Sequence, residues 1–171
     1  MAIISSLEKN QADKVVQAVY QSFEEKTGKV PEWAKVMAHC PKILKEFTEL
    51  FGVIMGNREI EPLLKWKVAY VVSNSLKCPF CVDVTGKMLK SLGASDQIIE
   101  KTKQEKSSSK KEEEILQLVR EVTLKAQVCT PELFERLKNE LSEKEIVEIV
   151  SIIGLFNYIN RFNNTFCILP E

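Results

Sequence analysis

The spacing of its apolar residues constrains the fold of this chain more than any other feature of the sequence. Apolar side chains recur at three- and four-residue intervals along most of the chain, which is the period of an amphipathic helix. The chain has only six Gly and six Pro, and no segment shows the clear alternation of a half-buried strand. A chain of 171 residues can bury about 70% of its unfolded surface. We therefore expect an all-α fold, with residues 1–171 forming a single-domain helical bundle of about eight helices.

Local signals predict where these helices begin and end. Proline suits the first turn of a helix, glycine suits its C-terminal end, and Ser142 with Glu145 has the spacing of a capping box. Residues 106–114, KSSSKKEEE, are expected to form a solvated loop that leads into a helix. The expected helices cover residues 9–27, a short segment from Pro31, 41–55, 61–76, 79–92, 95–103, a segment that ends at Val128, a segment that begins at Pro131, and 142–162.

The charge balance and the apolar runs exclude several classes of partner. The 24 Lys+Arg and 24 Asp+Glu give a formal net charge of zero, so there is no basic excess to neutralise nucleic acid phosphates. The longest uncharged apolar-rich run, residues 149–160, is shorter than the roughly 20 residues that cross a bilayer. No charged segment leads into an apolar stretch at the N-terminus. We therefore expect a cytoplasmic protein that binds neither nucleic acid nor membrane.

Two of the five cysteines, Cys78 and Cys81, are three positions apart. In a reducing compartment such a pair is usually catalytic or metal-binding. Pro79 suits the first position of a helix, so Cys78 would be the N-cap, where unpaired N–H groups and the helix dipole stabilise a thiolate. A thiolate is the nucleophile in peroxide reduction and disulfide exchange, and a second cysteine on the same helix face resolves the intermediate. We predict that Cys78 and Cys81 are catalytic.

Two other interpretations of the pair stay open. The cysteines could be packing residues, or they could be half of a zinc site. A zinc site needs two more ligands, and the remaining candidates are scattered singly, so we expect no metal and no cofactor. These candidates are Cys40, Cys129, Cys167 and His39. We expect the three single cysteines to be buried small apolar residues, and the histidine to cap a helix end or lie at the surface.

The segments that flank the pair decide between two scaffolds. Residues 71–81, VVSNSLKCPFC, resemble the strand and active-site start of a glutaredoxin, and Thr130-Pro131 could imitate its cis-proline loop. A glutaredoxin is a βαβ fold of about half this length. Here a long helical-looking region precedes the cysteines, and no strand or Gly-Gly turn follows Pro131. The flanks therefore argue against the glutaredoxin scaffold.

Three blocks in the same order resemble the peroxidase-related branch of the alkylhydroperoxidase D / carboxymuconolactone decarboxylase-like superfamily. They are residues 23–47 with a Gly-x-Val-Pro turn, residues 78–95, and FNYINRF at residues 156–162. The resemblance covers most of the chain. It implies an all-α fold that assembles as a homotrimer or hexamer, with a redox dithiol near the subunit interface. It also implies peroxide reduction with a protein or lipoyl dithiol partner or, in a branch without the cysteine pair, lactone decarboxylation.

The proton relay of that family is incomplete in this sequence. Trp66 stands where the resembling proteins carry the relay glutamate, and Thr85 stands where they carry a histidine four residues after the second cysteine. Phe80, between the cysteines, stands where a histidine is common. A threonine can form a hydrogen bond but cannot act as a base near neutral pH. We therefore expect weak or altered peroxide chemistry.

Four further residues are accessory candidates besides Thr85. Lys67 could favour a thiolate by its charge, although a solvated lysine is the favoured interpretation. Tyr70 could donate a hydrogen bond to a bound peroxide, although packing is favoured. Asn160 and Arg161, together with Asn157, could build the wall of the site or a subunit contact, although helix-end hydrogen bonding is favoured.

The sequence thus supports two functions. The first is a dithiol oxidoreductase that reduces peroxides or partner disulfides through Cys78 and Cys81. The alternative is a non-catalytic helical oligomer or binding module with a relic cysteine pair, which the missing relay residues suggest. A lactone decarboxylase comes third, because the histidines and arginines of that branch have no obvious counterparts. Zero net charge offers no field to steer a charged macromolecule, which favours a small peroxide or a dithiol/disulfide partner.

Overall fold

A computed structural model describes residues 2–125 and 131–170, except for the side chain of Leu133. All regular structure in these ranges is helical, which confirms the expected all-α class: nine α-helices and one short 3-10 helix are described, against the eight or so helices expected. The elements are η1 (Lys9–Gln11), α1 (Lys14–Thr27), α2 (Glu32–Met37), α3 (Pro41–Met55), α4 (Pro62–Ser75), α5 (Pro79–Ser91), α6 (Asp96–Lys103), α7 (Lys110–Leu124), α8 (Pro131–Glu140) and α9 (Glu143–Thr165).

Most helix ends follow the local signals. Gly28 has a φ of 78° and ends α1 in the left-handed conformation that glycine adopts without strain. Ser142 and Glu145 form the expected capping box at the start of α9. Proline occupies the first turn of α3, α4 and α5.

Several boundaries differ from the sequence-based expectations. The first helix is two elements, because Asp13 caps α1 and separates it from the short η1 turn. The polar patch at residues 106–114 is not all loop, because the Ser109 hydroxyl accepts the Glu112 N–H and α7 begins at Lys110. The last helix, α9, continues beyond residue 162 to Thr165. Helix α7 ends at Leu124, earlier than the expected Val128, because its C-cap Lys125 is extended. Val128 itself lies outside the described residues.

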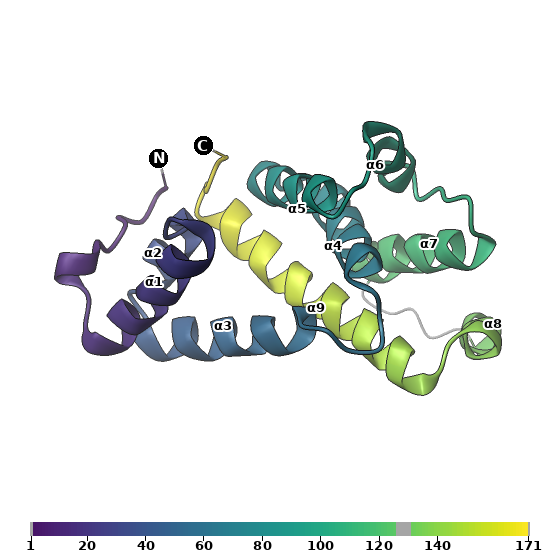
Figure 1. Cartoon of the computed structure of the whole chain (residues 1–171), viewed down its shortest axis with the longest axis horizontal. Helices are drawn as coiled ribbons and strands as arrows, with labels where there is room; N and C mark the ends of the chain where they lie inside the picture. Colours follow the sequence, from purple (N-terminus) through teal and green to yellow (C-terminus); the bar gives the residue numbers. More distant parts are fainter. Residues whose placement is uncertain (1, 126–130, 171) are drawn as a thin grey trace.

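The helices are arranged around α4 and α9. Helix α4 packs against α5, α6, α7 and α9, while α3 packs against α1, α2 and α9. Figure 1 shows the consequence: α9 runs diagonally through the molecule, with α1–α3 on one side and α4–α7 on the other. In the same view the end of α9 lies beside the start of α5, where the cysteine pair is.

Two apolar clusters form the interior. The larger one is built mainly from α3, α4, α7 and α9, and includes the fully buried Val68, Leu116 and Ile152. The smaller one centres on Leu89 in α5. Trp66 of α4 packs against both clusters, and its ring lies near two phenylalanines of α3 and α9. The two clusters are therefore joined through one side chain.

A buried ion pair closes the connection between α3 and α4. The Lys65 side chain is fully buried, and its Nζ donates to the backbone carbonyl of Ile54 at 2.9 Å and to that of Gly56. The same Nζ forms an ion pair with Glu148 of α9. The other Glu148 oxygen accepts the backbone N–H groups of residues 59 and 60 at 3.0 and 3.2 Å. The ammonium and the carboxylate thus hold the loop and α9 together.

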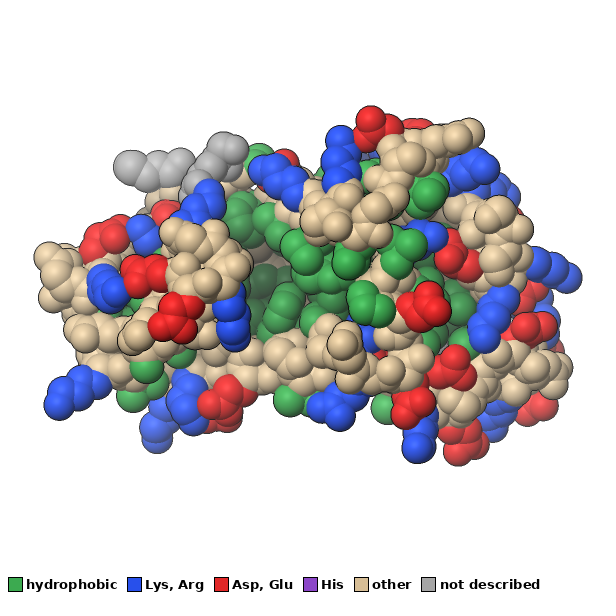
Figure 2. Space-filling view, viewed as in Figure 1, with side chains coloured by type: hydrophobic (Ala, Val, Ile, Leu, Met, Phe, Trp, Pro, Cys, Tyr) green, Lys and Arg blue, Asp and Glu red, His purple; other side chains and the backbone are tan. Residues whose placement is uncertain are grey.

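One face of the molecule carries an open apolar groove between α3 and α9. The green side chains in the hollow at the middle of Figure 2 lie over these elements. The groove has a volume of about 640 Å³ and is lined by Lys42, Ile43, Glu46, Phe47, Leu50, Ile54, Ser151, Gly154, Leu155 and Tyr158. About half of the surface of Ile43 and of Leu50 is exposed. None of the described helices is both long enough and apolar enough to cross a membrane.

Candidate redox site

The turn between α4 and α5 places both cysteines. Lys77 has a φ of 51°, so the chain reverses in the left-handed conformation immediately after α4. The Cys78 N–H donates to the Ser73 carbonyl and the Lys77 N–H donates to the Asn74 carbonyl, both at 3.2 Å. These two bonds are those of a Schellman motif, which satisfies the last carbonyls of α4. Cys78 then becomes the N-cap of α5, as the sequence predicts, with Pro79 at the first helical position.

The two sulfur atoms are in direct contact and are shielded from solvent. The Sγ atoms of Cys78 and Cys81 lie 2.7 Å apart as free thiols. The Cys81 backbone N–H donates to Cys78 Sγ at 3.4 Å, so the first sulfur takes the acceptor role of an N-cap side chain. Cys78 is 0% exposed and Cys81 is 4% exposed. A reagent therefore reaches either sulfur only if the surrounding side chains move.

The surroundings of the two thiols shift their pKa values in opposite directions. The hydrogen bond with Cys81 lowers the pKa of Cys78, and the backbone N–H groups of Cys81 and Phe80 lower it further, against the opposing effect of burial. The hydrogen bond with Cys78 raises the pKa of Cys81, and burial and the charge on Cys78 raise it further. The site therefore favours a thiolate on Cys78 and a proton on Cys81.

One contact of the pair comes from α9. Asn163 is fully buried, and its Nδ2 donates to Cys81 Sγ at 3.2 Å. This bond opposes the rise in the Cys81 pKa. Sequence reasoning missed Asn163, because the residue follows the FNYINRF block and lies 82 positions from Cys81. The available signal was its spacing from Asn160, because residues three apart lie on the same face of a helix.

Asn160 lies near the pair but does not reach it. Its Nδ2 donates to the Phe156 carbonyl at 2.7 Å and to the Ser73 hydroxyl at 3.3 Å. It therefore links α9 to the end of α4, just before the turn that holds Cys78. The Oδ1 atoms of Asn160 and Asn163 are buried and have no hydrogen-bond partner among the described residues. The polar groups beside the dithiol are thus only partly satisfied, which is uncommon for buried amides.

The other accessory candidates do not contact the sulfurs. Thr85 is buried, but its hydroxyl donates to the backbone carbonyl of Cys81 at 2.7 Å, within α5. Tyr70 is buried in the smaller apolar cluster, in agreement with the favoured packing role, and burial raises its pKa. Arg161 is exposed. The Asn157 amide donates to the Ile153 carbonyl at 3.0 Å, which is a bond inside α9 and not the helix-end bond that was expected.

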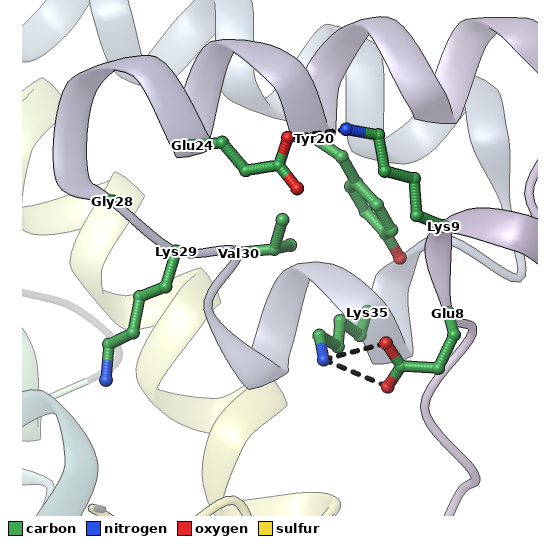
Figure 3. Close-up of a pocket in the computed structure, with 8 residues that line it drawn as sticks. All are labelled: Glu8, Lys9, Tyr20, Glu24, Gly28, Lys29, Val30 and Lys35. Carbon is green, nitrogen blue, oxygen red and sulfur yellow. Dashed lines mark hydrogen bonds and ion pairs between the residues drawn. The ribbon is translucent and has the colours of Figure 1, made fainter.

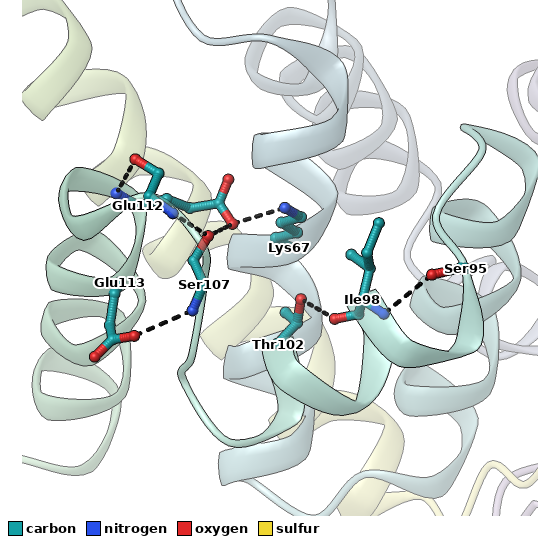
Figure 4. Close-up of polar contacts among 8 residues, drawn as sticks. Lys67, Ser95, Ile98, Thr102, Ser107, Glu112 and Glu113 are labelled. Carbon is teal, nitrogen blue, oxygen red and sulfur yellow. Dashed lines mark hydrogen bonds and ion pairs between the residues drawn. The ribbon is translucent and has the colours of Figure 1, made fainter.

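Lys67 forms an ion pair with Glu112 of α7. The favoured interpretation, a solvated lysine, is wrong, because only 8% of the residue is exposed. Its Nζ donates to Glu112 Oε1 at 2.6 Å, and the Ser107 hydroxyl donates to the same oxygen at 2.8 Å (Figure 4). The lysine charge is therefore held by the first turn of α7.

The expectation that the single cysteines are buried is wrong for the two that the structure describes. Cys40 and Cys167 are exposed, not buried, because each lies at a helix end where the chain turns. Cys129 lies outside the described residues. His39 is exposed, as expected, and its Nε2 is 2.8 Å from the Ser5 carbonyl. No group of three or more His, Cys, Asp or Glu side chains in the described part of the chain could hold a metal ion.

A second cavity lies in the N-terminal region, far from the cysteines in the sequence. It has a volume of about 360 Å³ and is lined by residues of η1, α1 and α2 (Figure 3). Two ion pairs cross it, Lys9 with Glu24 at 2.6 Å and Lys35 with Glu8 at 2.9 Å. Because these charges already satisfy one another, the cavity offers no unpaired group for a ligand among these four residues. Neither this cavity nor the α3–α9 groove is lined by Cys78 or Cys81.

The sequence by itself finds no relatives in two comparisons. No protein-family model matches the chain, and no curated protein sequence matches it. Solved structures, in contrast, match along nearly the whole chain. Likeness of this kind at low identity reports the fold.

Three solved structures illustrate the likeness. The alkylhydroperoxidase AhpD core protein of Ralstonia eutropha JMP134, described as an uncharacterized peroxidase-related protein, is 16% identical, covers 99% of this chain and 92% of its own, and has a TM-score of 0.89. The debrominase Bmp8 is 21% identical over 99% of this chain and 92% of its own, with a TM-score of 0.85. A cysteine-to-alanine variant of that debrominase has been solved with 2,3,4-tribromopyrrole.

The third structure has the highest sequence identity of the three. It is a protein of unknown function from Agrobacterium tumefaciens, described as a putative antioxidant defence protein AhpD. It is 26% identical, covers 79% of this chain and 94% of its own, and has a TM-score of 0.72. Taken with the helix order and the cysteine pair at the start of α5, these likenesses confirm the family resemblance of the sequence. The chain has the fold of the alkylhydroperoxidase D / carboxymuconolactone decarboxylase-like superfamily.

Proposed function

We propose that this protein is a dithiol oxidoreductase that reduces a small peroxide, or the disulfide of a partner, through Cys78 and Cys81. The observation that carries the proposal is the paired sulfurs at the N-terminus of α5, with the first sulfur favoured as a thiolate and the second as a thiol. Such a pair has the nucleophile and the resolving group that disulfide chemistry needs. A reducing compartment such as the cytoplasm keeps the pair in this form.

In the first step the Cys78 thiolate attacks the terminal oxygen of a hydroperoxide. The S–O bond forms as the O–O bond breaks, and the leaving alkoxide takes a proton from water to give an alcohol. Cys78 is thereby oxidised to a sulfenic acid. The Cys81 N–H, which points at Cys78 Sγ, stabilises the thiolate before the attack.

In the second step Cys81 attacks the Cys78 sulfur. The S–S bond forms, the S–O bond breaks, and hydroxide leaves with the proton of Cys81 as water. The disulfide is then reduced by an external dithiol, which becomes a disulfide itself and returns both protons. The resemblance favours a protein or lipoyl dithiol in this role.

The missing relay predicts slow chemistry. Trp66 packs against apolar side chains, and the Thr85 hydroxyl is bound to the helix backbone, so neither residue delivers a proton to the pair. A positioned acid or base contributes about 10²–10⁴-fold in rate. We expect a turnover rate lower by a factor of that order than that of proteins that carry the relay.

We also propose that the protein forms a homo-oligomer, a trimer or a hexamer, through the α3–α9 groove. Contiguous exposed apolar surface of this kind marks an interaction site. The rim carries Lys42 and Glu46, of opposite charge, and the zero net charge of the chain lets copies approach without repulsion. Sedimentation of wild type and Leu50→Glu at equal concentration tests this point, and a wild type that sediments as a monomer contradicts it.

The burial of both sulfurs favours one alternative, a non-catalytic module with a relic pair. Consumption of hydrogen peroxide, with dihydrolipoamide as the electron donor, separates the two. The proposal expects turnover by wild type and a loss of at least about 100-fold in Cys78→Ser and in Cys81→Ser. Cys40→Ser, which removes an exposed thiol, is the matched control and is expected to keep wild-type turnover. Equal rates in wild type and the Cys78→Ser/Cys81→Ser double variant would establish the relic.

A further inference from the structure

The Asn163 amide is a polar contact to the dithiol from outside its own helix. It reaches Cys81 Sγ from the last turn of α9, at 3.2 Å. Both residues are at least 96% buried, where water competes little for the bond and hydrogen bonds are strengthened. Cys78, in contrast, accepts a backbone N–H of its own helix. Cys78 Sγ thus accepts a backbone N–H, whereas Cys81 Sγ accepts a side-chain N–H from another helix.

We propose that Asn163 is a positioning residue that prepares Cys81 for the disulfide-forming step. The inference rests on the proposed function and deepens it, because it assigns to one residue the second of the two steps. It replaces no base: the amide neither gives nor takes a proton. Its N–H group stabilises negative charge as this charge develops on Cys81 Sγ.

The order of charges explains why the second step needs such a donor. While Cys78 is a thiolate, its charge keeps the proton on Cys81. Once Cys78 carries oxygen as a neutral sulfenic acid, that charge is gone, and Cys81 must release its proton to attack. The Asn163 N–H is already directed at the sulfur that becomes negative. Stabilisation that exists before the charge forms lowers the barrier without a cost of reorganisation.

The fold fixes the backbone that carries this side chain. The Asn163 backbone carbonyl accepts the Ile168 N–H at 2.9 Å, in a turn where Cys167 is left-handed with a φ of 55°. The neighbouring Asn164 side-chain amide donates to the Leu76 carbonyl at 3.0 Å, which fixes the end of α9 onto the α4–α5 turn. A site whose supporting backbone is fixed in this way keeps its donor close to the reacting atom.

The orientation of the Asn163 amide fits the same role. A side-chain amide offers an acceptor and a donor on one rotatable group. Nδ2 faces Cys81 Sγ, and Oδ1 has no partner among the described residues, so the amide directs its donor and not its acceptor at the sulfur. No rotation of the side chain is needed when Cys81 loses its proton.

The experiment follows the two steps separately. The reduced protein receives one equivalent of hydrogen peroxide, and dimedone traps any sulfenic acid while intact-mass spectrometry counts adduct and disulfide over time. Asn163→Leu keeps the volume and removes the donor, Asn163→Gln keeps a donor, and Asn157→Leu is the matched control on the same helix. In Asn163→Leu we expect disulfide formation at neutral pH to be at least about tenfold slower, with sulfenic acid accumulating on Cys78.

The pH profile distinguishes this role from a loss of packing. In Asn163→Leu the rate of disulfide formation should regain the wild-type value only at higher pH, because Cys81 must then lose its proton unaided. Asn163→Gln should recover part of the neutral-pH rate, and Asn157→Leu should match wild type. If Asn163→Leu fails to unfold cooperatively in urea, Asn163→Ala takes its place in the same assay.

A wild-type rate of disulfide formation and an unchanged pH profile in the donor-free variant would overturn the inference. Failure of the proposed function looks different. In that case Cys81→Ser, which cannot form the disulfide, would give no dimedone adduct on Cys78 at any pH.

Discussion

Two buried polar sites lie near the two ends of α4, and they differ in how completely their groups are paired. Near the N-terminal end, Lys65 uses its ammonium on two carbonyls and on Glu148, whose carboxylate also accepts two backbone N–H groups. Near the C-terminal end, Cys81 meets the Asn163 amide, but two amide oxygens there have no partner among the described residues.

The difference separates a structural site from a chemical one. A buried charge that lies against its counter-charge is held in one arrangement, because either charge alone would be costly to bury. A buried site with unused acceptors and a thiol costs stability, and natural sequences keep such defects mainly where chemistry occurs. Removal of one partner of the Lys65–Glu148 ion pair should therefore cost more stability than removal of an amide at the dithiol end.

The largest expected effect is at the ion pair. Lys65→Ala should lower the free energy of unfolding by about 3–5 kcal/mol, because it leaves the Glu148 carboxylate buried without its counter-charge. Urea denaturation measures the change. The control, Lys87→Ala, removes an exposed i,i+4 pair with Asp83 and should cost less than about 0.5 kcal/mol.

A second variant sharpens this prediction. Lys65→Met combined with Glu148→Gln removes both charges and keeps an acceptor for the N–H groups of residues 59 and 60. It should recover most of the lost stability, since the penalty comes from the unpaired charge. A double variant as unstable as Lys65→Ala would show that the loop, not the charge, carries the effect.

The dithiol end should tolerate the loss of an amide better. Asn160→Ala removes the bonds to Phe156 and Ser73 but also removes one unsatisfied oxygen. We expect a loss of about 1–2 kcal/mol in the same urea titration. A loss as large as that of Lys65→Ala would contradict the contrast between the two ends.

The smallest expected effect is an increase in stability, at Lys77. Lys77 adopts a left-handed conformation that costs a non-glycine residue about 1–2 kcal/mol. Lys77→Gly should raise the free energy of unfolding by about 0.5–1 kcal/mol, after the added freedom of the unfolded chain is subtracted. Lys77→Ala is the control, because alanine keeps the strain. A gain of equal size in both variants would mean that the side chain, not the backbone, is responsible.

Rules that act within one turn of helix predicted much of the site. Pro79 at the first helical position predicts that Cys78 is an N-cap, and the i,i+3 spacing predicts that Cys81 lies next to it. The structure has both features. The role of Asn163 could not be predicted from the sequence, because its contact with Cys81 joins two helices that are far apart in the chain. The family resemblance supplied the fold but did not indicate which α9 side chain meets the thiols.

The wrong expectations have a common physical cause. Lys67 was expected in solvent because its partner, Glu112, depends on where α7 begins and how it packs on α4. Cys40 and Cys167 were expected in the core because unpaired cysteines are commonly buried. Both instead occupy exposed helix ends. The first error concerns packing between helices and the second concerns exposure at helix ends, and periodicity within one helix gives no information on either.

The position of Trp66 makes it an optical reporter. The sequence has two tryptophans, and Trp66 contacts both apolar clusters and lies 6.0 Å from Phe156 and 6.4 Å from Phe51 by ring centroids. In a Trp33→Phe background its fluorescence would follow the centre of the molecule alone. A shift of its emission to longer wavelength would then record the separation of the two clusters, in real time and without any attached dye.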